Sequence, residues 1–299
     1  MVKNVSIIIP SLDRNRVLFS TLRDLLKQNY PLFEIIVVDQ TDTPSRKFLD
    51  FINDHKDKIR YIQEKKKSSP HARNVGVKQA IGEVVLFLDD DIEIKNQKFI
   101  QYHLQNFLDP KVGLVGGRVI HGTDGKVPKK LEVGRLKFWG LKEVTHFNAT
   151  KKVEIDHAAG GNFSVYKKIY DQVGGFAEIY KGNAHMEETD FCLRVKRAGY
   201  KLIFEPKAVL LHLQYNQGGN RTRDIYEFRY WLVHNSTVFY LKNYPKVIFP
   251  LFFINKLFWA VSSSLKRRDM KMFKTMFGAI IDGDRYYRKI SKNYQASSS

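Results

Sequence analysis

The sequence predicts an α/β fold with a mainly parallel, doubly wound central sheet. Two observations predict it: short apolar runs alternate with stretches of helical periodicity over residues 5–91, and the apolar runs end at polar or acidic residues. Alternation of this kind is typical of strand–helix–strand units, whose strands lie parallel. A chain of 299 residues, 43% of them hydrophobic, can bury the core of one large domain or of a domain with an appendage.

The first strand and helix are predicted near the N-terminus. Residues 5–9 form a short apolar run that ends at Pro10, as expected of a buried strand. The next apolar residues recur at helical spacing and lie on one face: Val17, Leu18, Leu22, Leu25 and Leu26. The pattern therefore predicts a strand, a polar turn and a helix.

A second unit of the same kind follows. Residues 35–38 are apolar and end at Asp39, and a helical pattern then covers residues 48–52. A further strand over residues 60–62 and a helix over residues 72–80 continue the alternation. We therefore expect a parallel sheet with helices between successive strands.

The predicted sheet is organised around residues 84–91. Five apolar residues run directly into three aspartates, Asp89 to Asp91, so the acids are expected where a strand buried on both faces leaves the sheet. Because neighbouring strand ends share one edge, these acids are expected to meet Ser11 and Asp39 in one crevice. Adjacent carboxylates repel one another, so a cation or donated hydrogen bonds would stabilise them there; the alternative is a solvated acidic turn.

Seven short stretches occur along the chain in a fixed order. They are Ile7-Ile8-Ile9-Pro10-Ser11, Glu34-Ile35-Ile36-Val37-Val38-Asp39, Ala72-Arg73-Asn74-Val75-Gly76, Leu88-Asp89-Asp90-Asp91, Gly160-Gly161-Asn162-Phe163, Gly174-Gly175-Phe176 and Glu187-Glu188-Thr189-Asp190-Phe191. This ordered set resembles the inverting family 2 glycosyltransferases, among them members that build bacterial or archaeal polysaccharides. The resemblance covers residues 5 to about 215.

The resemblance implies a GT-A type nucleotide-sugar-binding fold, which is Rossmann-like, with a C-terminal helical appendage. We expect a catalytic domain over residues 1–220, with a donor-binding half over about 1–118 and an acceptor-binding half over about 119–220. Residues 221–299 are expected to form the helical appendage, for which membrane association is one of two interpretations.

The resemblance assigns five residues to the donor nucleotide: Pro10, Ser11, Asp39, Arg73 and Asp89. Asp39 would accept a hydrogen bond from the base, which suits the imide N–H of uracil or thymine, while guanine also offers N–H donors. A UDP-, dTDP- or GDP-linked sugar is therefore expected, and the base stays open because Gln40-Thr41-Asp42 departs from the family pattern. Arg73 would open a helix whose N-terminal amides also attract an anion.

The resemblance also places a divalent metal, Mn²⁺ or Mg²⁺, at Asp91, with Asp89 assisting and with His212 of a late strand as a third ligand. Such hard cations take carboxylate oxygens together with phosphate oxygens and water. Asp90 is expected to be structural or to face solvent. A rival use of Asp-X-Asp, the nucleophile and acid of aspartate-dependent phosphatases, is disfavoured because Glu93 stands where that motif has Thr or Val.

Glu188 is expected to be the general base and Asp190 a supporting acid, at the start of a helix whose N-terminus stabilises the carboxylate form. The alternative is that both acids only cap the helix. Four further residues are expected to bind the acceptor: Gly160, Gly161, Asn162 and Glu187. Paired glycines would let the backbone approach a sugar closely.

Two polar segments are assigned to the substrates. The polar and basic stretch over residues 122–153 is long enough to be a functional or mobile loop, and the resemblance implies that it meets the acceptor. The segment 218–221 is expected to cover the site, with Arg221 or Arg223 close to phosphate.

Beyond about residue 224 the pattern becomes helical and aromatic. The apolar stretch over residues 247–261 approaches the ~20 apolar residues of a spanning helix, but Pro250, Asn255 and Lys256 interrupt it. Basic and apolar residues then recur at helical spacing over residues 266–277, as in an interfacial helix on an anionic leaflet. A helical subdomain packed on the catalytic domain is the alternative.

The charge of the chain calls for an acidic partner. It carries 50 Lys and Arg against 31 Asp and Glu, a formal net charge of +19, which suits a diphosphate substrate, an anionic membrane surface or nucleic acid.

The predicted function is metal-dependent, inverting transfer of a hexosyl or related sugar to a glycan or lipid-linked glycan, in cell-envelope polysaccharide biosynthesis. The alternative, a non-catalytic basic nucleic-acid-binding protein, leaves the buried acids without a role, so nucleic acid is not the expected partner.

A cytoplasmic protein, peripheral on the inner face of the cell membrane, is expected. The single cysteine, Cys192, excludes an intramolecular disulfide and suits a reducing compartment. The apolar stretch after Lys3 is far shorter than the apolar region of a signal peptide.

Overall fold

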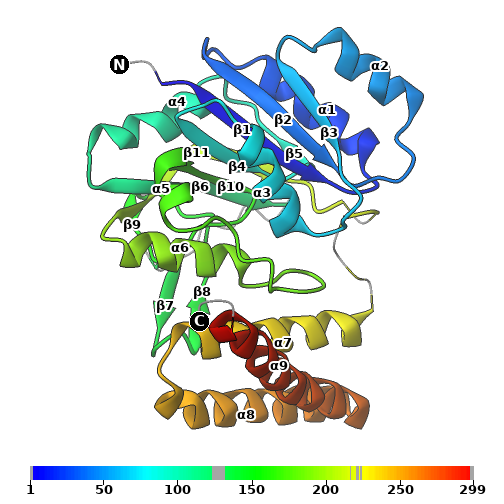
Figure 1. Ribbon diagram of the computed structural model, residues 1–299, viewed down its shortest axis with the longest axis vertical. Coiled ribbons are helices and arrows are strands. Elements are labelled where there is room, and N and C mark those ends of the chain that lie inside the picture. The colour runs from blue at the N-terminus through cyan, green and yellow to red at the C-terminus, as the bar shows by residue number, and fades with distance from the viewer. Residues whose placement is uncertain (1–2, 123–131, 216, 220–221, 223, 297–299) are drawn as a thin grey trace.

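The computed structural model describes residues 3–122, 132–215, 217–219, 222 and 224–296. An α/β layer built on a central sheet lies against a separate layer of long helices from the C-terminal part of the chain (Figure 1). The α/β fold and the helical appendage predicted from the sequence are both present.

The central sheet has the order β3-β2-β1-β4-β10-β6-β11-β5, and β9 pairs with β11. Its strands are β1 (Val5–Ser11), β2 (Phe33–Asp39), β3 (Ile59–Gln63), β4 (Val84–Leu88), β5 (Ile92–Glu93), β6 (Val112–His121), β9 (Val153–Glu154), β10 (Asn162–Tyr166) and β11 (Lys201–His212). β3, β2, β1 and β4 are parallel neighbours, and β6 pairs parallel with β11, so the predicted mainly parallel sheet is confirmed. β10 departs from a purely parallel arrangement, because it runs antiparallel between β4 and β6.

The first strand is longer than predicted. β1 does not end at Pro10 but continues to Ser11, which pairs with Asp39 of β2. Its pairing with β4 stops at Ile8, so Pro10 has a neighbouring strand on one side only. Proline is tolerated at such an edge because no ladder hydrogen bond is lost. Ser11 thereby reaches the strand ends where Asp39 and the acids after β4 lie.

Helices cover both faces of the sheet (Figure 1). They are α1 (Asn15–Leu26), α2 (Arg46–Asp54) and α4 (Phe99–Leu104) with the 3₁₀ turn η1 (Gln105–Leu108) on one face, and α3 (Ser69–Gln79), α5 (Lys167–Gln172) and α6 (Glu187–Arg197) on the other. The alternation of strand side chains decides which core each residue joins: Ile7 packs with Leu18 of α1, whereas Ile8 packs with Ala72 of α3. α3 and α6 therefore begin on the same face, close to the end of β4.

The stretch predicted as an acceptor-facing loop contains a β-hairpin. β7 (Arg135–Lys137) and β8 (Lys142–Val144) pair antiparallel and extend from the α/β layer towards the helical layer (Figure 1). Residues 123–131 of the predicted loop lie outside the described residues.

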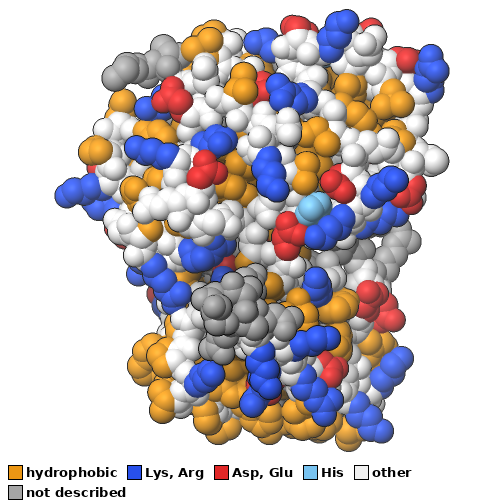
Figure 2. All heavy atoms as spheres, in the orientation of Figure 1, with side chains coloured by type: hydrophobic (Ala, Val, Ile, Leu, Met, Phe, Trp, Pro, Cys, Tyr) orange, Lys and Arg blue, Asp and Glu red, His pale blue; other side chains and the backbone are white. Residues whose placement is uncertain are grey.

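The appendage consists of α7 (Ile225–Asn243), the short turn η2 (Lys246–Ile248), α8 (Phe249–Arg267) and α9 (Met270–Ala296). Val233, Ala260 and Met276 belong to a core shared by the three long helices. The basic and apolar stretch after residue 262 does not form one continuous helix, because Arg268 has a left-handed backbone, φ 52°, and ends α8. Hydrophobic side chains gather along the outer edge of this layer (Figure 2).

Candidate active site

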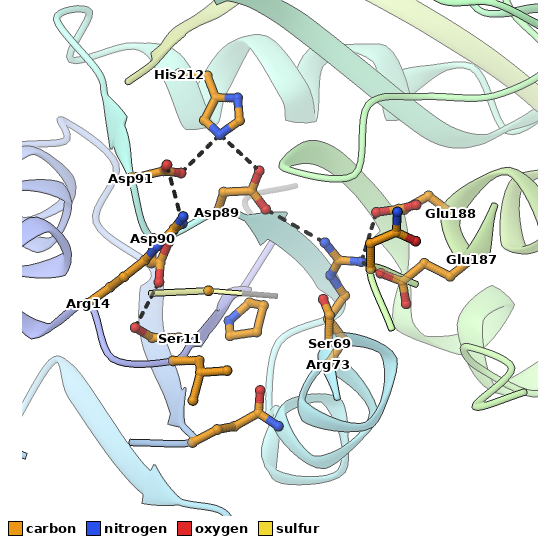
Figure 3. A pocket seen from close by; sticks show the side chains of 15 residues that line it. Ser11, Arg14, Ser69, Arg73, Asp89, Asp90, Asp91, Glu187, Glu188 and His212 are labelled. Carbon is orange, nitrogen blue, oxygen red and sulfur yellow. Dashed lines mark hydrogen bonds and ion pairs between the residues drawn. The ribbon is translucent and has the colours of Figure 1, made fainter. Parts of the chain in front are cut away.

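A pocket opens where β1, β4 and β11 end and where α3 and α6 begin (Figure 3). Side chains from widely separated parts of the sequence line it: Pro10, Ser11, Leu12, Arg14, Gln40, Ser69, Arg73, Asp89, Asp90, Asp91, Asn183, Glu187, Glu188, His212 and Gly219. Most of the predicted site residues are therefore in one place. This follows from the parallel strands, whose carboxyl ends share one edge of the sheet.

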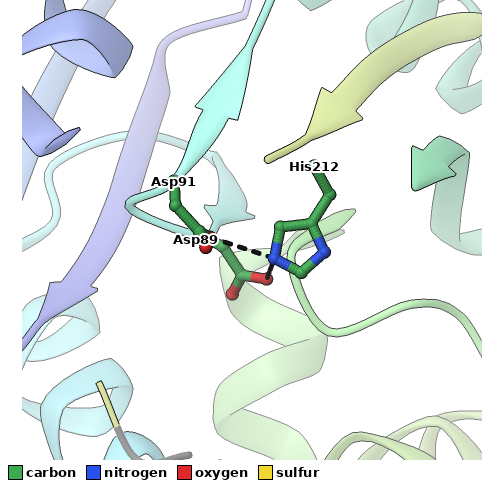
Figure 4. Close-up of side chains that lie close together, drawn as sticks. All are labelled: Asp89, Asp91 and His212. Carbon is green, nitrogen blue, oxygen red and sulfur yellow. Dashed lines mark ion pairs between the residues drawn. The ribbon is translucent and has the colours of Figure 1, made fainter. Parts of the chain in front are cut away.

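Asp89, Asp91 and His212 converge on one side of the pocket (Figure 4). Nε2 of His212 lies 3.0 Å from Oδ1 of Asp91 and 3.7 Å from Oδ2 of Asp89. The two acids follow β4 and the histidine ends β11, so the sheet fixes their spacing. One ligand atom from each residue lies within 4.8 Å of the others, which is the arrangement of a three-residue metal site.

The surroundings of this group favour ionised acids and an oriented histidine. Oδ2 of Asp91 accepts a hydrogen bond from the backbone N–H of Tyr215 at 2.9 Å. Burial would raise the pKa of Asp91, but His212 and Arg14 outweigh burial and hold that pKa below its usual value. Nδ1 of His212 lies 3.2 Å from Nδ1 of His121. This contact orients the ring of His212 with Nε2 towards the acids.

The residues present fit a divalent cation. Oδ1 of Asp91 is buried and receives no hydrogen bond, although it faces the shared space beside His212. Two carboxylates and one imidazole suit Mn²⁺, which accepts both oxygen and nitrogen ligands. Asp89 is the more open acid, with its side chain 32% exposed, so it faces the pocket where a substrate would lie.

Asp90 does not face solvent, which corrects one of the two alternatives predicted for it. Its side chain is buried between Ser11, whose hydroxyl donates at 2.8 Å, and Arg14, whose Nη1 donates at 2.9 Å. Burial raises the pKa of Asp90 to about 6, and Arg14 opposes that shift. Asp90 is therefore a structural acid that holds the loop after β1 against the end of β4.

Arg14 is a pocket residue that the sequence argument did not single out. Its Nε donates to the carbonyl of Gln217 at 2.9 Å and its Nη2 to that of Tyr215 at 2.9 Å. Its Nη1 also lies 3.3 Å from Asp91. Arg14 thus joins the loop after β1, the aspartates and the segment after β11. Since its partners lie up to 203 residues away, no local pattern could have revealed this role.

Arg73 lies between the two acidic groups of the pocket, on the first turns of α3 (Figure 3). Its guanidinium contacts Glu187 and Glu188 on one side, the latter at 3.1 Å, and lies 3.7 Å from Asp89 on the other. Its side chain is 3% exposed. The contact with donor phosphate stays a prediction. Within the protein, Arg73 connects Asp89 on one side of the pocket with Glu187 and Glu188 on the other.

Glu187 and Glu188 are neighbours in sequence but occupy different environments. The side chain of Glu187 is 3% exposed and that of Glu188 is 24% exposed. Burial raises the pKa of Glu187 well above its usual value; Arg73 opposes the shift and Glu188 adds to it. Burial and the neighbouring Glu188 therefore favour the neutral form of Glu187, while Glu188 opens to the pocket. Two acids whose environments differ in this way are typical of general acid–base sites.

Gly160 and Gly161 each lie against a carboxylate of the pocket, Gly160 against Glu188 and Gly161 against Asp89. A Cβ atom on Gly160 would lie 2.0 Å from Oε1 of Glu188, and one on Gly161 would lie 2.1 Å from Oδ2 of Asp89. The backbone of both glycines thus lies against the carboxylates of Glu188 and Asp89, and its approach to a sugar stays a prediction. Only glycine leaves space for the acids at these two positions.

Asn162, predicted to bind the acceptor, has its side chain inside the protein instead. Its amide donates to the carbonyls of Arg118 and Ala208, both at 3.0 Å, and its Oδ1 lies 3.0 Å from Nε2 of His103. These bonds tie β10 to its neighbours, because Asn162 is the first residue of an inner strand and pairs with Leu88. Asn162 is therefore a structural residue that positions the adjacent glycines.

Asp190, predicted as a supporting acid, points away from the pocket. Lys242 donates to its two oxygens at 2.6 and 2.7 Å, Asn243 at 2.8 Å and Arg194 at 3.0 Å. Burial would raise the pKa of Asp190, but Lys242 and Arg194 outweigh it and lower that pKa. Glu188 and Asp190 are two residues apart, a rotation of about 200°, so they lie on different sides of α6. Asp190 joins α6 to α7.

Asp39 ends β2 as predicted and is fully buried. Asn15, Tyr61 and the hydroxyl and backbone N–H of Thr41 all donate to its carboxylate, at 2.5–3.0 Å. Asp39 is absent from the described pocket lining, whereas Gln40 beside it is part of that lining. Arg221 and Arg223, predicted near phosphate, lie outside the described residues.

Comparison with known proteins agrees with this geometry. The sequence model of glycosyl transferase family 2 matches residues 6–173. The chain is 24% identical over 214 residues to a probable glycosyltransferase, YdaM, of Bacillus subtilis, covering 69% of this chain and 49% of that protein. It is 26% identical over 240 residues to the O-antigen biosynthesis protein RfbC of Myxococcus xanthus, covering 76% of this chain and 18% of that protein. The chain thus spans half or less of the length of these curated relatives.

A solved structure shares the fold over the whole chain. The mannosyltransferase PcManGT of Pyrobaculum calidifontis, in complex with GDP-Man and Mn²⁺, superimposes with a TM-score of 0.58 at 15% identity, covering 100% of this chain and 81% of that one. At this identity the likeness establishes a GT-A type fold. Because the family match covers more than half of the sequence, including both β4 and the aspartates after it, the chain belongs to glycosyl transferase family 2.

Proposed function

We propose that this protein is a metal-dependent, inverting glycosyltransferase that moves a sugar from a nucleotide-sugar donor to a hydroxyl of a glycan or lipid-linked glycan. One observation carries the proposal: the Asp89, Asp91 and His212 group and the open carboxylate of Glu188 face one pocket, with Arg73 between them. A donor and an acceptor can then meet between a cation site and a base.

Asp91, Asp89 and His212 would hold the cation, Mn²⁺ or Mg²⁺. When bound, such an ion neutralises the developing charge of a departing diphosphate. The Pyrobaculum mannosyltransferase was solved with a nucleotide sugar and Mn²⁺, which supports the same partners for this chain. Ser11 and Pro10 at the end of β1 line the same side of the pocket, where the nucleotide would lie.

Glu188 would act as the general base. Its carboxylate takes the proton of the acceptor hydroxyl while that oxygen attacks the anomeric carbon, and the nucleoside diphosphate leaves from the opposite face. This single displacement inverts the anomeric configuration. Glu187 is buried and bound to Arg73, so its carboxyl group is less accessible to an acceptor hydroxyl than that of Glu188. Its role would be to hold Arg73 beside Glu188.

The division of the pocket supports the predicted donor and acceptor halves. The residues of β1, β4 and α3 would serve the donor, within residues 1–118. The backbone at Gly160 and Gly161 and the start of α6 would serve the acceptor, within residues 119–220. The Myxococcus relative acts in O-antigen biosynthesis, by its name, and this supports a cell-envelope glycan as the acceptor.

A transfer assay with a panel of donors tests this proposal. The full-length protein is incubated with UDP-, GDP- and dTDP-sugars, Mn²⁺ and water or a simple alcohol as acceptor, and the anomeric proton of the product is followed by NMR. We expect one donor to give product with inverted configuration, and chelation to stop the reaction. Product with retained configuration would contradict the single displacement.

A further inference from the structure

One face of α8 carries large apolar side chains into solvent. Within the described residues, Val247, Leu251, Ile254, Phe258, Val261 and Leu265 are 40–83% exposed. Their spacing of three or four residues places them on one narrow stripe along η2 and α8. We call this set the outer stripe. Isolated exposed apolar residues are common, but a continuous stripe of this length marks a contact surface.

The opposite side of α8 is already used. Phe252, Ala260 and Ser264 are buried, and Ala260 belongs to the core that α8 shares with α7 and α9. The outer stripe is therefore distinct from the inward face of α8. It is a second apolar face on a helix whose first face is packed.

The tip of the β7–β8 hairpin adds two aromatic side chains to this region. Phe138 and Trp139 are 68% and 63% exposed and both have a positive φ, 50° and 52°. The next residue, Gly140, packs on Tyr244, which lies at the junction between α7 and η2. The hairpin tip therefore lies beside the beginning of the outer stripe. Exposed Trp and Phe next to an apolar helix are typical of proteins that insert into the headgroup region of a bilayer.

The charges around the outer stripe favour an anionic partner. The sequence from residue 244 to residue 268 contains no Asp or Glu, whereas Lys246, Lys266, Arg267 and Arg268 are all exposed. The net charge of the whole chain, +19, has the same sign. A second copy of this chain would bring the same basic residues against one another, so self-association through the stripe is disfavoured. An anionic lipid surface complements both the apolar stripe and its basic ends.

We propose that the outer stripe and the hairpin tip dock on an anionic phospholipid bilayer, with α8 lying in the plane of the headgroups. Residues 246–267 are also long and apolar enough to span a membrane by composition alone. Spanning would, however, pull α8 from its core and place Lys256 at mid-membrane. Nζ of Lys256 now lies 5.4 and 5.3 Å from the rings of Phe252 and Trp259, where Glu143 of the hairpin attracts it.

Vesicle flotation of the full-length protein tests the proposal. Vesicles of phosphatidylcholine alone are compared with vesicles containing a quarter phosphatidylglycerol, at low and high salt. We expect the protein to float with the anionic vesicles and to be released partly by salt, because screening weakens the basic contacts. Equal binding to neutral and anionic vesicles, or binding to neither, would overturn the proposal.

Surface variants locate the contact without disturbing the core. I254S/F258S replaces two exposed members of the outer stripe, and we expect vesicle affinity to fall about tenfold or more. K266Q/R267Q/R268Q should lower affinity for anionic vesicles by about fivefold per charge. Matched controls are L108S, an exposed leucine in the α/β layer, and K47Q/K95Q/K98Q, exposed lysines in that layer; both should bind as the parent does.

The same variants distinguish a lipid surface from the alternative partner of the outer stripe, a second copy of this chain. If the stripe joined two copies of the chain, light scattering would show a dimer of the parent that I254S/F258S converts to a monomer, and vesicle binding would be missing. We expect instead that parent and variant have the same mass in solution. Retained vesicle binding by I254S/F258S, or lost binding by L108S, would place the contact elsewhere and overturn the proposal.

Discussion

Glu188→Gln is expected to lower the sugar-transfer rate by about 10²–10⁴-fold, because glutamine keeps the shape of the side chain and cannot take a proton. Donor binding should change little, since the cation group on the other side of the pocket is untouched. The rate is measured under single-turnover conditions, and nucleotide binding by calorimetry. Glu188→Asp should keep part of the activity, because a base remains at a longer distance from the acceptor.

Glu187→Gln is the matched control for this prediction. Glu187 is adjacent and has the same side chain, but burial raises its pKa, so a neutral amide should perturb this position less than it perturbs Glu188. The variant should lose much less activity than Glu188→Gln. A Glu187→Gln enzyme that is inactive beside a fully active Glu188→Gln enzyme would assign the base to Glu187.

Asp190→Asn is expected to act on stability. The substitution removes the counter-charge of Lys242 and Arg194 at a fully buried position that joins α6 to α7. Breaking a buried ion pair on one side costs about 3–5 kcal/mol, and the partial exposure of Lys242, 27%, places the expected loss near the lower end, about 3 kcal/mol. Chemical denaturation at pH 7 measures the free energy of unfolding. Asp171→Asn, an exposed acid paired with Lys167 in α5, should change it by no more than about 0.5 kcal/mol.

The difference in the free energy of unfolding between the parent and Asp190→Asn should depend on pH. The pKa of Asp190 is lower in the folded protein than in the unfolded chain, so its contribution is complete above the unfolded value of about 4 and is lost as the pH falls below it. The difference in stability between the parent and Asp190→Asn should therefore shrink as the pH falls from about 5 towards the folded pKa. A difference that grows in acid would contradict this assignment of the ion pair.

The sequence predicted the elements with regular periodicity and the residues at strand ends. Apolar runs identify buried strands, and parallel strands bring their carboxyl ends together, so Ser11 and Asp89 to Asp91 were placed correctly in one pocket. The inserted antiparallel strand β10 was not predicted, because a five-residue strand carries no mark of its direction or neighbours. Only the pairing of Phe163 with Phe87 and Gly116 reveals its position.

Residue roles that depend on the direction of a side chain were harder to predict from the sequence. Asp190 follows Glu188 by two residues, and helical geometry turns the two side chains to different sides. Asn162 continues the Gly160-Gly161 pair in sequence, yet the strand directs its side chain inward to His103. To predict the orientation of Asp190 and Asn162, one would need to know which face of the helix or strand each residue occupies, as well as the type of element.

Arg14 and Asn183 illustrate a different limit. Each lines the pocket through contacts made with distant segments, and neither belongs to a periodic pattern. Arg14 bonds carbonyls of the segment after β11, so its position depends on the whole sheet being assembled. A single sequence contains no local signal for such a contact.

The most direct test of the proposed function is nucleotide binding with and without Mn²⁺. Titration calorimetry with UDP and GDP should show at least about tenfold tighter binding of one nucleotide in Mn²⁺ than in chelator, and Asp91→Asn should remove that difference. Asp50→Asn, an exposed acid on α2, should keep it. If the parent binds both nucleotides equally well in Mn²⁺ and in chelator, the group of Asp89, Asp91 and His212 is not a metal site for the donor.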